Sequence, residues 1–387
     1  MGASKLEERL NRNILSLEES LIRKFNIHAQ LKGAKYFLTL GEPDFPTPKI
    51  IKEACIKALE ADKTKYSLTV GNQGFRRKIR EFELNKNEVD YEEDEILITT
   101  GSTEALTCSL LTMLNPGDEV ILLTPTYPLY QQIINFAGGQ VINYDTSSDQ
   151  FQINEKRLAS LITNRTKAMI ITSPNNPTGT ILSDESLDII HRAVIQHGFF
   201  VISDECYNQI VYGPRRLGIS KFQDIKDSII VCQSLSKPYA MPGWRLGYML
   251  APKGFLKHAM KMHQYMVVCV NTFIQDAGMV AMDFDPSEMV ESYEMRRDYV
   301  YSRLCEIGIE VVKPEGAFYM FPSIKKYGLD SWEFCSRLVE EEGIALIPGK
   351  CFGADDFVRI SYCVEMSVII QAIDGLERFI KNLELKI

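Results

Sequence analysis

The 387-residue sequence predicts an α/β fold, with a mostly parallel, doubly wound sheet in a large domain beside a smaller α+β domain. Three observations support this prediction. Short apolar runs alternate with longer segments of helical spacing from about residue 50 to 285. Most of these runs are continuously apolar, as in strands that helices cover on both faces. Polar residues follow directly after several of the runs.

The expected strands of the large sheet are the short apolar runs themselves. In chain order they are Glu95–Thr99, Glu119–Leu123, Gln140–Tyr144, Lys167–Thr172, Phe199–Ser203, Ser228–Gln233 and Arg245–Leu250. Several of the segments between them carry helical spacing, as in Leu106, Leu110, Leu111 and Leu114 before the stop at Asn115. This alternation is typical of a doubly wound sheet.

The pattern changes beyond about residue 285, where we expect the second domain to continue. Its expected elements are an amphipathic helix over Pro286–Ile307, a strand over Ala317–Phe321, a helix opened by Asp330 with Glu333, an alternating strand over Phe357–Tyr362 and a final helix over roughly Met366–Leu385. The N-terminal helix and the turn at Gly41 are expected to complete it. We therefore assign residues 48–285 to the large domain, and residues 1–47 and 286–387 to the small one.

The composition is that of an ordinary globular protein, with 45% hydrophobic and 24% charged residues. The net charge of −8 argues against nucleic acid and anionic membranes as partners. The sequence has no apolar run long enough to span a bilayer and no secretory leader. Its nine cysteines are scattered and include no C-x-x-C pair. We expect a cytoplasmic protein.

Lys237 and its neighbours carry the clearest chemical signal. The lysine follows a buried strand, where partial desolvation lowers the pKa of an amine and frees it for Schiff-base chemistry. Ser234, Ser236 and Arg245 lie close to it in sequence, and hydroxyls with a guanidinium suit a phosphate dianion. The pattern indicates a carbonyl cofactor with a phosphate group.

The segment around Lys237 resembles the lysine signature of the class I/II aminotransferases that use pyridoxal 5′-phosphate. It is most similar to their aromatic and N-acetyl-diaminopimelate branch. The residues that match are Ser234, Ser236, Lys237, Gly243 and Arg245. Pro238 and Pro242 depart from the commonest form of the signature, which puts no catalytic group in doubt. The resemblance extends from Gly41 to Arg359 and implies the type I fold of these enzymes.

The resemblance implies roles for the polar residues at the strand ends. Lys237 would hold the cofactor as an imine, and Asp204 would pair with its protonated pyridine nitrogen. Tyr207 and Asn176 would donate hydrogen bonds to its phenolic oxygen. The cup for its phosphate would consist of Ser102, Thr103, Ser234, Ser236 and Arg245. Taken alone, Asp204 also fits a turn carboxylate, Asn176 a plain turn, and Ser102 or Thr103 a helix N-cap.

Four further residues are assigned by the same resemblance. Tyr127 would stack on the cofactor ring, although a loop aromatic packed into the core fits equally well. Tyr66 would reach the phosphate of the neighbouring subunit, so the active unit would be a homodimer. Arg359 would grip the substrate α-carboxylate, with the backbone of Gly41 beside it. An arginine on an alternating strand is more often a solvent-facing residue or half of a surface ion pair.

The implied activity is ping-pong transfer of an amino group from an L-amino acid to a 2-oxo acid, most simply 2-oxoglutarate. A carbon–sulfur β-lyase on the same fold is the nearest alternative. A non-catalytic ligand-sensing domain fits less well, because no helix-turn-helix module is evident. A nicotinamide-dependent oxidoreductase lacks its glycine fingerprint. The five histidines form no H-E-x-x-H motif, so no metal is expected.

Overall fold

The computed structural model describes residues 9–15 and 17–385. Its main sheet has seven strands in the spatial order β2-β8-β7-β6-β5-β3-β4. These strands are β2 (Ile96–Thr99), β3 (Glu119–Thr124), β4 (Gln140–Asp145), β5 (Thr166–Thr172), β6 (Phe200–Asp204), β7 (Ile229–Ser234) and β8 (Gly247–Leu250). All the strands predicted for this sheet are present, with ends displaced by one or two residues. The α/β prediction is therefore confirmed.

The directions of the strands bring their carboxyl ends together. Strands β3 to β7 are parallel to one another, whereas β8 is antiparallel to both of its neighbours, β2 and β7. Because β8 reverses the direction twice, β2 runs the same way as β7. The loops that follow β2, β3, β5, β6 and β7 therefore leave the same edge of the sheet, which is where open α/β sheets bind their ligands.

Helices cover both faces of this sheet, which explains why its strands are continuously apolar. In β3, Val120 and Leu122 belong to one buried cluster, while Ile121 and Leu123 belong to another on the opposite face. The first cluster includes residues of α5 (Gly101–Met113), α6 (Leu129–Phe136) and α9 (Lys253–Val267). The second includes residues of α3 (Lys49–Glu60), α4 (Gln73–Asn87), α7 (Glu155–Leu161), α8 (Asp184–His197) and α10 (Thr272–Ala281).

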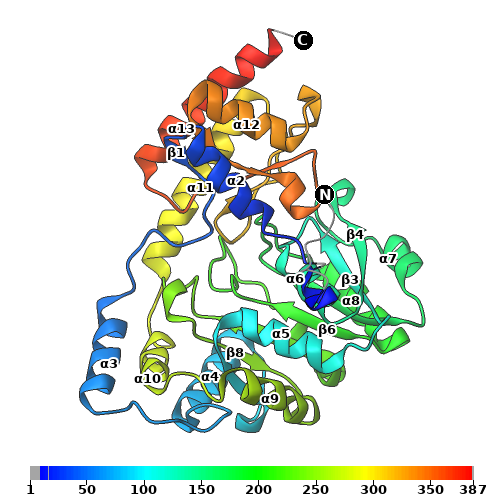
Figure 1. Cartoon of the computed structure of the whole chain (residues 1–387), viewed down its shortest axis with the longest axis vertical. Helices are drawn as coiled ribbons and strands as arrows, with labels where there is room; N and C mark the ends of the chain where they lie inside the picture. Colours follow the sequence, from blue (N-terminus) through cyan, green and yellow to red (C-terminus); the bar gives the residue numbers. More distant parts are fainter. Residues whose placement is uncertain (1–8, 16, 386–387) are drawn as a thin grey trace.

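A second, smaller part of the molecule lies at the top of Figure 1. Its three-stranded antiparallel sheet consists of β9 (Tyr319–Met320), β11 (Ile347–Pro348) and β12 (Val358–Ser361). Beside it, β1 (Tyr36–Phe37) pairs in parallel with β10 (Ile344–Ala345), which ties the N-terminal region to the C-terminal one. The helices here are α2 (Leu21–Leu31), α11 (Ser287–Ile307), α12 (Ser331–Glu342) and α13 (Met366–Glu384). A short α1 (Arg12–Leu15) precedes α2 in the chain and lies beside α6 of the larger part (Figure 1).

These elements match most of the prediction for the small domain. Asp330 caps α12 as expected, because its side chain accepts a hydrogen bond from the backbone N–H of Glu333 at 2.8 Å. Two strand predictions were too long: only Tyr319–Met320 of Ala317–Phe321, and Val358–Ser361 of Phe357–Tyr362, are strands. The domain boundaries stay a prediction, and residues 1–8, 16, 386 and 387 of the proposed small domain lie outside the described residues.

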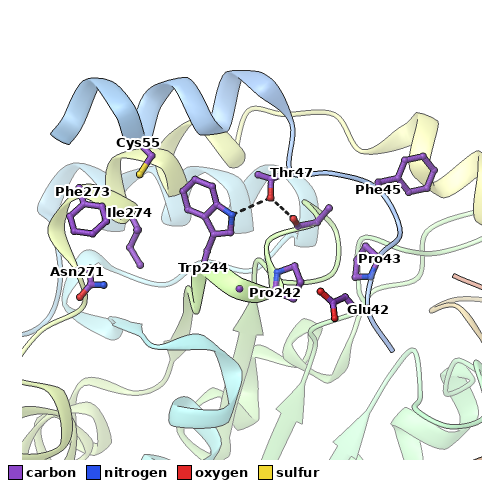
Figure 2. Close-up of a pocket in the computed structure, with 12 residues that line it drawn as sticks. Glu42, Pro43, Phe45, Thr47, Cys55, Pro242, Trp244, Asn271, Phe273 and Ile274 are labelled. Carbon is purple, nitrogen blue, oxygen red and sulfur yellow. Dashed lines mark hydrogen bonds between the residues drawn. The ribbon is translucent and has the colours of Figure 1, made fainter. Parts of the chain in front are cut away.

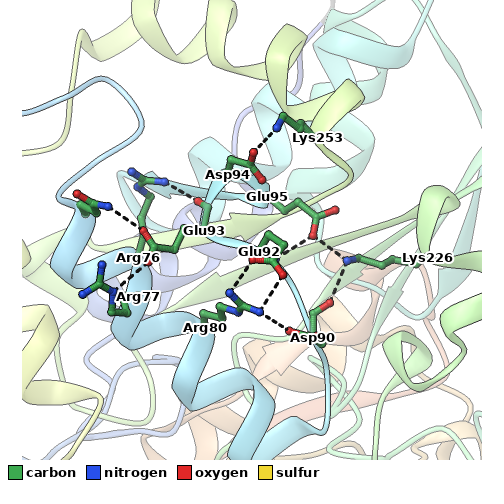
Figure 3. A network of polar contacts seen from close by, with 11 residues as sticks. Arg76, Arg77, Arg80, Asp90, Glu92, Glu93, Asp94, Glu95, Lys226 and Lys253 are labelled. Atoms are coloured by element: carbon green, nitrogen blue, oxygen red, sulfur yellow. Dashed lines mark hydrogen bonds and ion pairs between the residues drawn. The ribbon is translucent and has the colours of Figure 1, made fainter.

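A network of ion pairs holds the start of β2, at the end of the strand that lies away from the ligand-binding edge (Figure 3). Arg80 pairs with Glu92 at 2.6 Å, and Lys226 pairs with Glu95 at 2.7 Å. The largely buried guanidinium of Arg76 donates to the backbone carbonyl of Glu93. These contacts fix the origin of the strand that leads into α5.

Across the residues that the structure describes, every helix is too short or too polar to cross a bilayer. The cytoplasmic location stays a prediction.

Candidate active site

A cavity of about 880 Å³ lies where the carboxyl edge of the large sheet meets the smaller part of the molecule. Every residue predicted for the site, with the exception of Tyr66, lines this cavity. Residues of α2, α5, β6 and β9 also contribute to its wall. The fold therefore brings together side chains that are far apart in the sequence.

Lys237 follows the end of β7 and is partly buried in this cavity. Its Nζ donates a hydrogen bond to the carbonyl oxygen of Gly41 at 2.6 Å. Desolvation lowers the pKa of this amine from its ordinary value, although Cys206, Cys363 and Glu42 act in the opposite direction. None of the described carboxylates forms an ion pair with it. The environment therefore increases the share of the neutral, nucleophilic amine relative to an exposed lysine.

Asp204 ends β6, and only 4% of its surface is exposed. Burial raises the pKa of its carboxyl group. Two hydrogen bonds oppose this effect, one from the hydroxyl of Tyr130 to Oδ2 at 2.8 Å and one from the backbone N–H of Cys206 to Oδ1 at 3.3 Å. The bond from Cys206 is typical of a carboxylate in a turn. Asp204 also lines the cavity, where its carboxylate can pair with a cationic group of a ligand.

The N-terminus of α5 and the guanidinium of Arg245 form one end of the cavity. Gly101 has a φ of 74°, and a Cβ there would lie 2.9 Å from Nη2 of Arg245, so only glycine lets the guanidinium approach this closely. The N-cap of α5 is Thr100, which means that neither Ser102 nor Thr103 caps the helix. A helix N-terminus, free hydroxyls and a guanidinium together suit a phosphate group.

Two serines complete this cup from the other side. Ser234 Oγ donates to Ser236 Oγ at 2.8 Å, and the backbone N–H of Ser236 donates to Ser234 Oγ at 3.1 Å. Arg245 donates to the backbone carbonyl of Pro242 at 3.2 Å, and within the part of the chain that the structure describes no carboxylate pairs with it. Its positive charge is therefore available to an anion.

Arg359 is 3% exposed, which excludes the alternative of a solvent-facing side chain. All the residues of β12 are buried, because Val358 and Ile360 pack in the hydrophobic core of the small part while Arg359 faces the cavity. Arg359 Nη1 donates to Asn176 Oδ1 at 2.9 Å, and Nη2 donates to the carbonyl of Thr39 at 2.6 Å. Its Nε has no acceptor among the described residues. A buried guanidinium without a carboxylate partner suits a substrate carboxylate.

The remaining predicted residues divide between the cavity and the surface. The hydroxyls of Tyr207 and Tyr319 lie 2.7 Å apart. Tyr127 is 36% exposed and contacts Tyr130 edge-on, with 5.9 Å between the ring centroids. Tyr66 is 85% exposed and lies outside the cavity.

Comparison with known proteins agrees with this geometry. Residues 35–376 match the family model described as aminotransferase class I and II. The chain belongs to this family. The aminotransferase is 39% identical to a probable N-acetyl-LL-diaminopimelate aminotransferase of Bacillus subtilis over 97% of its own length and 96% of that protein. It is 34% identical to aromatic-amino-acid aminotransferase 2 of Thermococcus litoralis, over 95% and 97% of the two chains.

Solved structures agree as well. A double mutant of Thermus thermophilus aspartate aminotransferase superposes with a TM-score of 0.91 at 31% identity, over 95% of this chain and 99% of that one. The family identifies an enzyme rather than a ligand-sensing domain, and membership implies dependence on pyridoxal phosphate. The residues of the aminotransferase fit that cofactor, because the cavity combines an amine of lowered pKa, a buried carboxylate and a phosphate cup.

Two residues of the site were missed by the sequence interpretation. Tyr130 reaches Asp204 from α6, and Tyr319 reaches Tyr207 from β9. Tyr319 lies in the apolar run Ala317–Phe321, which predicts only a core position, and Tyr130 is followed by two glutamines. Nothing in their local sequence distinguishes them from other buried tyrosines.

Proposed function

We propose that this aminotransferase moves the amino group of an L-amino acid to a 2-oxo acid, 2-oxoglutarate, by a ping-pong mechanism in which Lys237 is the catalytic base. The observation that carries the proposal is the placement of Lys237, Asp204 and Arg359 in one cavity. The lysine amine has a lowered pKa, and the arginine has free capacity for a carboxylate. Proton transfer, pairing with the cofactor ring and binding of the substrate carboxylate would therefore each have a separate side chain, namely Lys237, Asp204 and Arg359.

Pyridoxal phosphate, when bound, supplies an electron sink for the charge that develops at the substrate Cα. Ser102, Thr103, Ser234, Ser236 and Arg245 would hold its phosphate, and Lys237 would hold its aldehyde carbon covalently. The carboxylate of Asp204 would keep the ring nitrogen protonated by offering it an anionic partner. Tyr207 and Asn176 would donate hydrogen bonds to its phenolic oxygen, and Tyr127 would cover one face of its ring.

The protein side of the reaction consists of orientation and proton movement. Arg359 would bind the α-carboxylate, and the backbone of Gly41 would border it, which fixes the Cα–H bond relative to Lys237. The freed Nζ of Lys237 would take the proton from the substrate Cα and deliver it to the C4′ carbon of the cofactor. The first step requires the neutral amine, and desolvation lowers the pKa of Lys237 in the direction that favours this form.

We further propose a homodimer in which Tyr66 enters the partner's site. The 85% exposed Tyr66 lies on a loop that is fixed to the start of α10. Thr272 Oγ1 donates to the carbonyl of Lys65 at 2.6 Å, and Gln275 Nε2 donates to Ser67 Oγ at 3.1 Å. A loop that is held firmly while it presents an aromatic ring to solvent is suited to contact another subunit.

A second cavity, of about 610 Å³, continues this surface toward the Lys237 loop (Figure 2). Asn271 and Phe273, which flank the start of α10, lie on one side of Trp244 in Figure 2, and Pro43 and Phe45 lie on the other. Trp244 Nε1 donates to Thr47 Oγ1 at 3.1 Å, and Thr47 Oγ1 donates to the carbonyl of Ala240 at 2.5 Å. This open cavity supports the proposal of a partner subunit that covers the surface beside the Tyr66 loop.

A panel of amino donors tested with 2-oxoglutarate examines the proposal. Aspartate, phenylalanine, tyrosine, alanine and N-acetyl-LL-diaminopimelate each serve as donor, and glutamate formation is measured. The proposal predicts glutamate from at least one donor, with an equal amount of the corresponding 2-oxo acid. Release of ammonia and pyruvate from a cysteine conjugate, with no need for 2-oxoglutarate, would instead identify the carbon–sulfur β-lyase.

A further inference from the structure

Tyr319 contacts the polar groups of the site although the cofactor-binding roles described above do not include it. Its hydroxyl lies 2.7 Å from the hydroxyl of Tyr207. The exposed fractions of the two side chains are 1% for Tyr319 and 4% for Tyr207. A hydrogen bond between two buried phenols is therefore part of the cavity wall, and one of the two must donate to the other.

The position of the Tyr319 ring is fixed from several sides. Its centroid lies 5.6 Å from that of Tyr207 in an edge-on contact, and 4.9 Å from that of Phe318. Its hydroxyl occupies the space beside Gly41, where a Cβ would lie 2.1 Å from the phenolic oxygen. The carbonyl of the same glycine accepts the hydrogen bond from Lys237. Any side chain at residue 41 would therefore collide with the Tyr319 hydroxyl, so only glycine fits there.

The two hydroxyls form one hydrogen bond between them, and this bond uses only one of their two protons. Each hydroxyl has one proton to donate, and within the described residues each finds its only hydrogen-bond partner in the other. One proton forms the Tyr207–Tyr319 bond, and the other remains without an acceptor. The unpaired proton is therefore available to an oxygen atom inside the cavity that both residues line.

The charge of Arg359 decides which phenol donates. Its guanidinium carbon lies 4.5 Å from the centroid of the Tyr319 ring. A cation beside a phenol favours the loss of its proton, so it makes that phenol the better hydrogen-bond donor. Arg359 opposes the effect of burial on the pKa of Tyr319 more strongly than any other group does. Tyr319 therefore donates to Tyr207, and the Tyr207 proton is the one left free.

We propose that Tyr319 is a positioning residue, whose hydroxyl donates to Tyr207 and thereby directs the Tyr207 proton toward the phenolic oxygen of the bound cofactor. This inference rests on the proposed function. Consecutive hydrogen bonds polarise one another, so the bond from Tyr319 makes Tyr207 a stronger donor. A stronger donor stabilises the ionised phenolic oxygen and lowers the pH at which the lysine-bound cofactor loses its proton.

The substitution Tyr319→Phe removes the hydroxyl and leaves the ring in place. Its matched control is Tyr362→Phe, because Tyr362 and Tyr212 form a second pair of buried phenols, 3.3 Å apart, that does not line the cavity. The readout is the midpoint of the pH titration of the visible absorbance in the cofactor-loaded enzyme. We expect Tyr319→Phe to raise this midpoint by about half a pH unit. This shift is smaller than that for loss of a whole hydrogen bond, because the bond from Tyr207 to the cofactor is weakened and not removed. Tyr362→Phe should leave it at the wild-type value.

A double-mutant cycle with Tyr207→Phe tests whether Tyr319 acts through Tyr207. The proposal predicts that the double variant titrates at the same midpoint as Tyr207→Phe alone, because the second substitution has nothing left to polarise. A midpoint for Tyr319→Phe equal to wild type, or shifts that add in the double variant, would overturn it. Should Tyr319→Phe not fold, Tyr319→Leu also lacks the hydroxyl and must shift the midpoint in the same direction. Failure of the proposed function is distinct, because the donor panel would then give no glutamate from 2-oxoglutarate, whereas the midpoint is measured on the loaded enzyme without any substrate.

Discussion

Tyr130 on α6 donates a hydrogen bond to Oδ2 of Asp204 at the end of β6, over 2.8 Å. The same hydroxyl lies 2.8 Å from Thr172 Oγ1. Burial alone raises the pKa of Asp204, and the bond from Tyr130 is the largest influence that lowers it. Tyr130 therefore helps to keep Asp204 ionised in a site where desolvation favours its neutral form.

Tyr130→Phe should narrow the active pH range from the acid side. Loss of a hydrogen bond to the ionised carboxylate raises the pKa of Asp204, so the ionised form disappears at a higher pH than in wild type. We expect the acid limb of the kcat/KM profile to move up by about one unit, the value of one such bond. Tyr144→Phe, which removes a tyrosine hydroxyl bound to the backbone of Asn154, is the control and should keep the wild-type profile. Identical pH profiles for Tyr130→Phe and Tyr144→Phe would show that Tyr130 does not control the ionisation of Asp204.

Arg359→Lys should weaken recognition of the α-carboxylate while it keeps the positive charge. A lysine cannot reproduce the planar fork of a guanidinium, so we expect kcat/KM to fall by about 100-fold for both the amino acid and the 2-oxo acid. Steady-state kinetics of each half-reaction measure this. The reaction of the loaded enzyme with an amine that lacks a carboxylate should change little. An equal loss for that amine would show that Arg359 acts on folding or cofactor binding instead.

Mixed dimers test the proposed role of Tyr66. Neither Lys237→Ala nor Tyr66→Ala homodimers should have appreciable activity. A dimer with one subunit of each kind contains one site with both lesions and one site with neither. Mixing the two unfolded variants and refolding them together should therefore restore activity well above that of either parent, measured as glutamate formation. Activity that never exceeds that of the Tyr66→Ala parent would place Tyr66 in the site of its own subunit, or in none.

Glu205, the neighbour of Asp204, should make the stability of the protein depend on pH. Burial, with a contribution from the charge of Glu83, raises the pKa of Glu205 to about 7, although Ser203 and Asn208 donate hydrogen bonds to it. Its contribution to stability is present below the pKa of the unfolded chain and is lost as the pH rises through 7. Glu205→Gln should remove this loss. Between pH 5 and pH 8 its unfolding free energy should gain about 2 kcal/mol relative to wild type.

Urea unfolding of both proteins at the two pH values measures this difference. The control is Glu185→Gln, which replaces a carboxylate in the first turn of α8 and should show no such change with pH. If Glu205→Gln and wild type lose stability in parallel between pH 5 and pH 8, then Glu205 is already ionised at pH 5 and its burial has no such effect.

The sequence predicted the large sheet well because helices bury both of its faces, and the resulting continuous apolar runs are distinct from helical spacing. It also predicted most of the site, since the polar residues that follow strands of one direction must meet at one edge. The strands β1, β10 and β11 have two residues each, too few to show any period. Tyr130 and Tyr319 act through contacts 74 and 112 residues away in sequence. Such contacts follow from the packing of whole elements, which local pattern does not encode.

Borohydride reduction of the enzyme loaded with pyridoxal phosphate tests whether Lys237 binds the cofactor covalently. We expect a visible absorbance band that borohydride removes, and a cofactor-modified peptide in which mass spectrometry places the label on Lys237. Lys237→Ala should show neither the band nor the label and should not turn over. A wild-type protein without the band, a label on another lysine, or full activity in Lys237→Ala would show that Lys237 is not the residue that binds the cofactor.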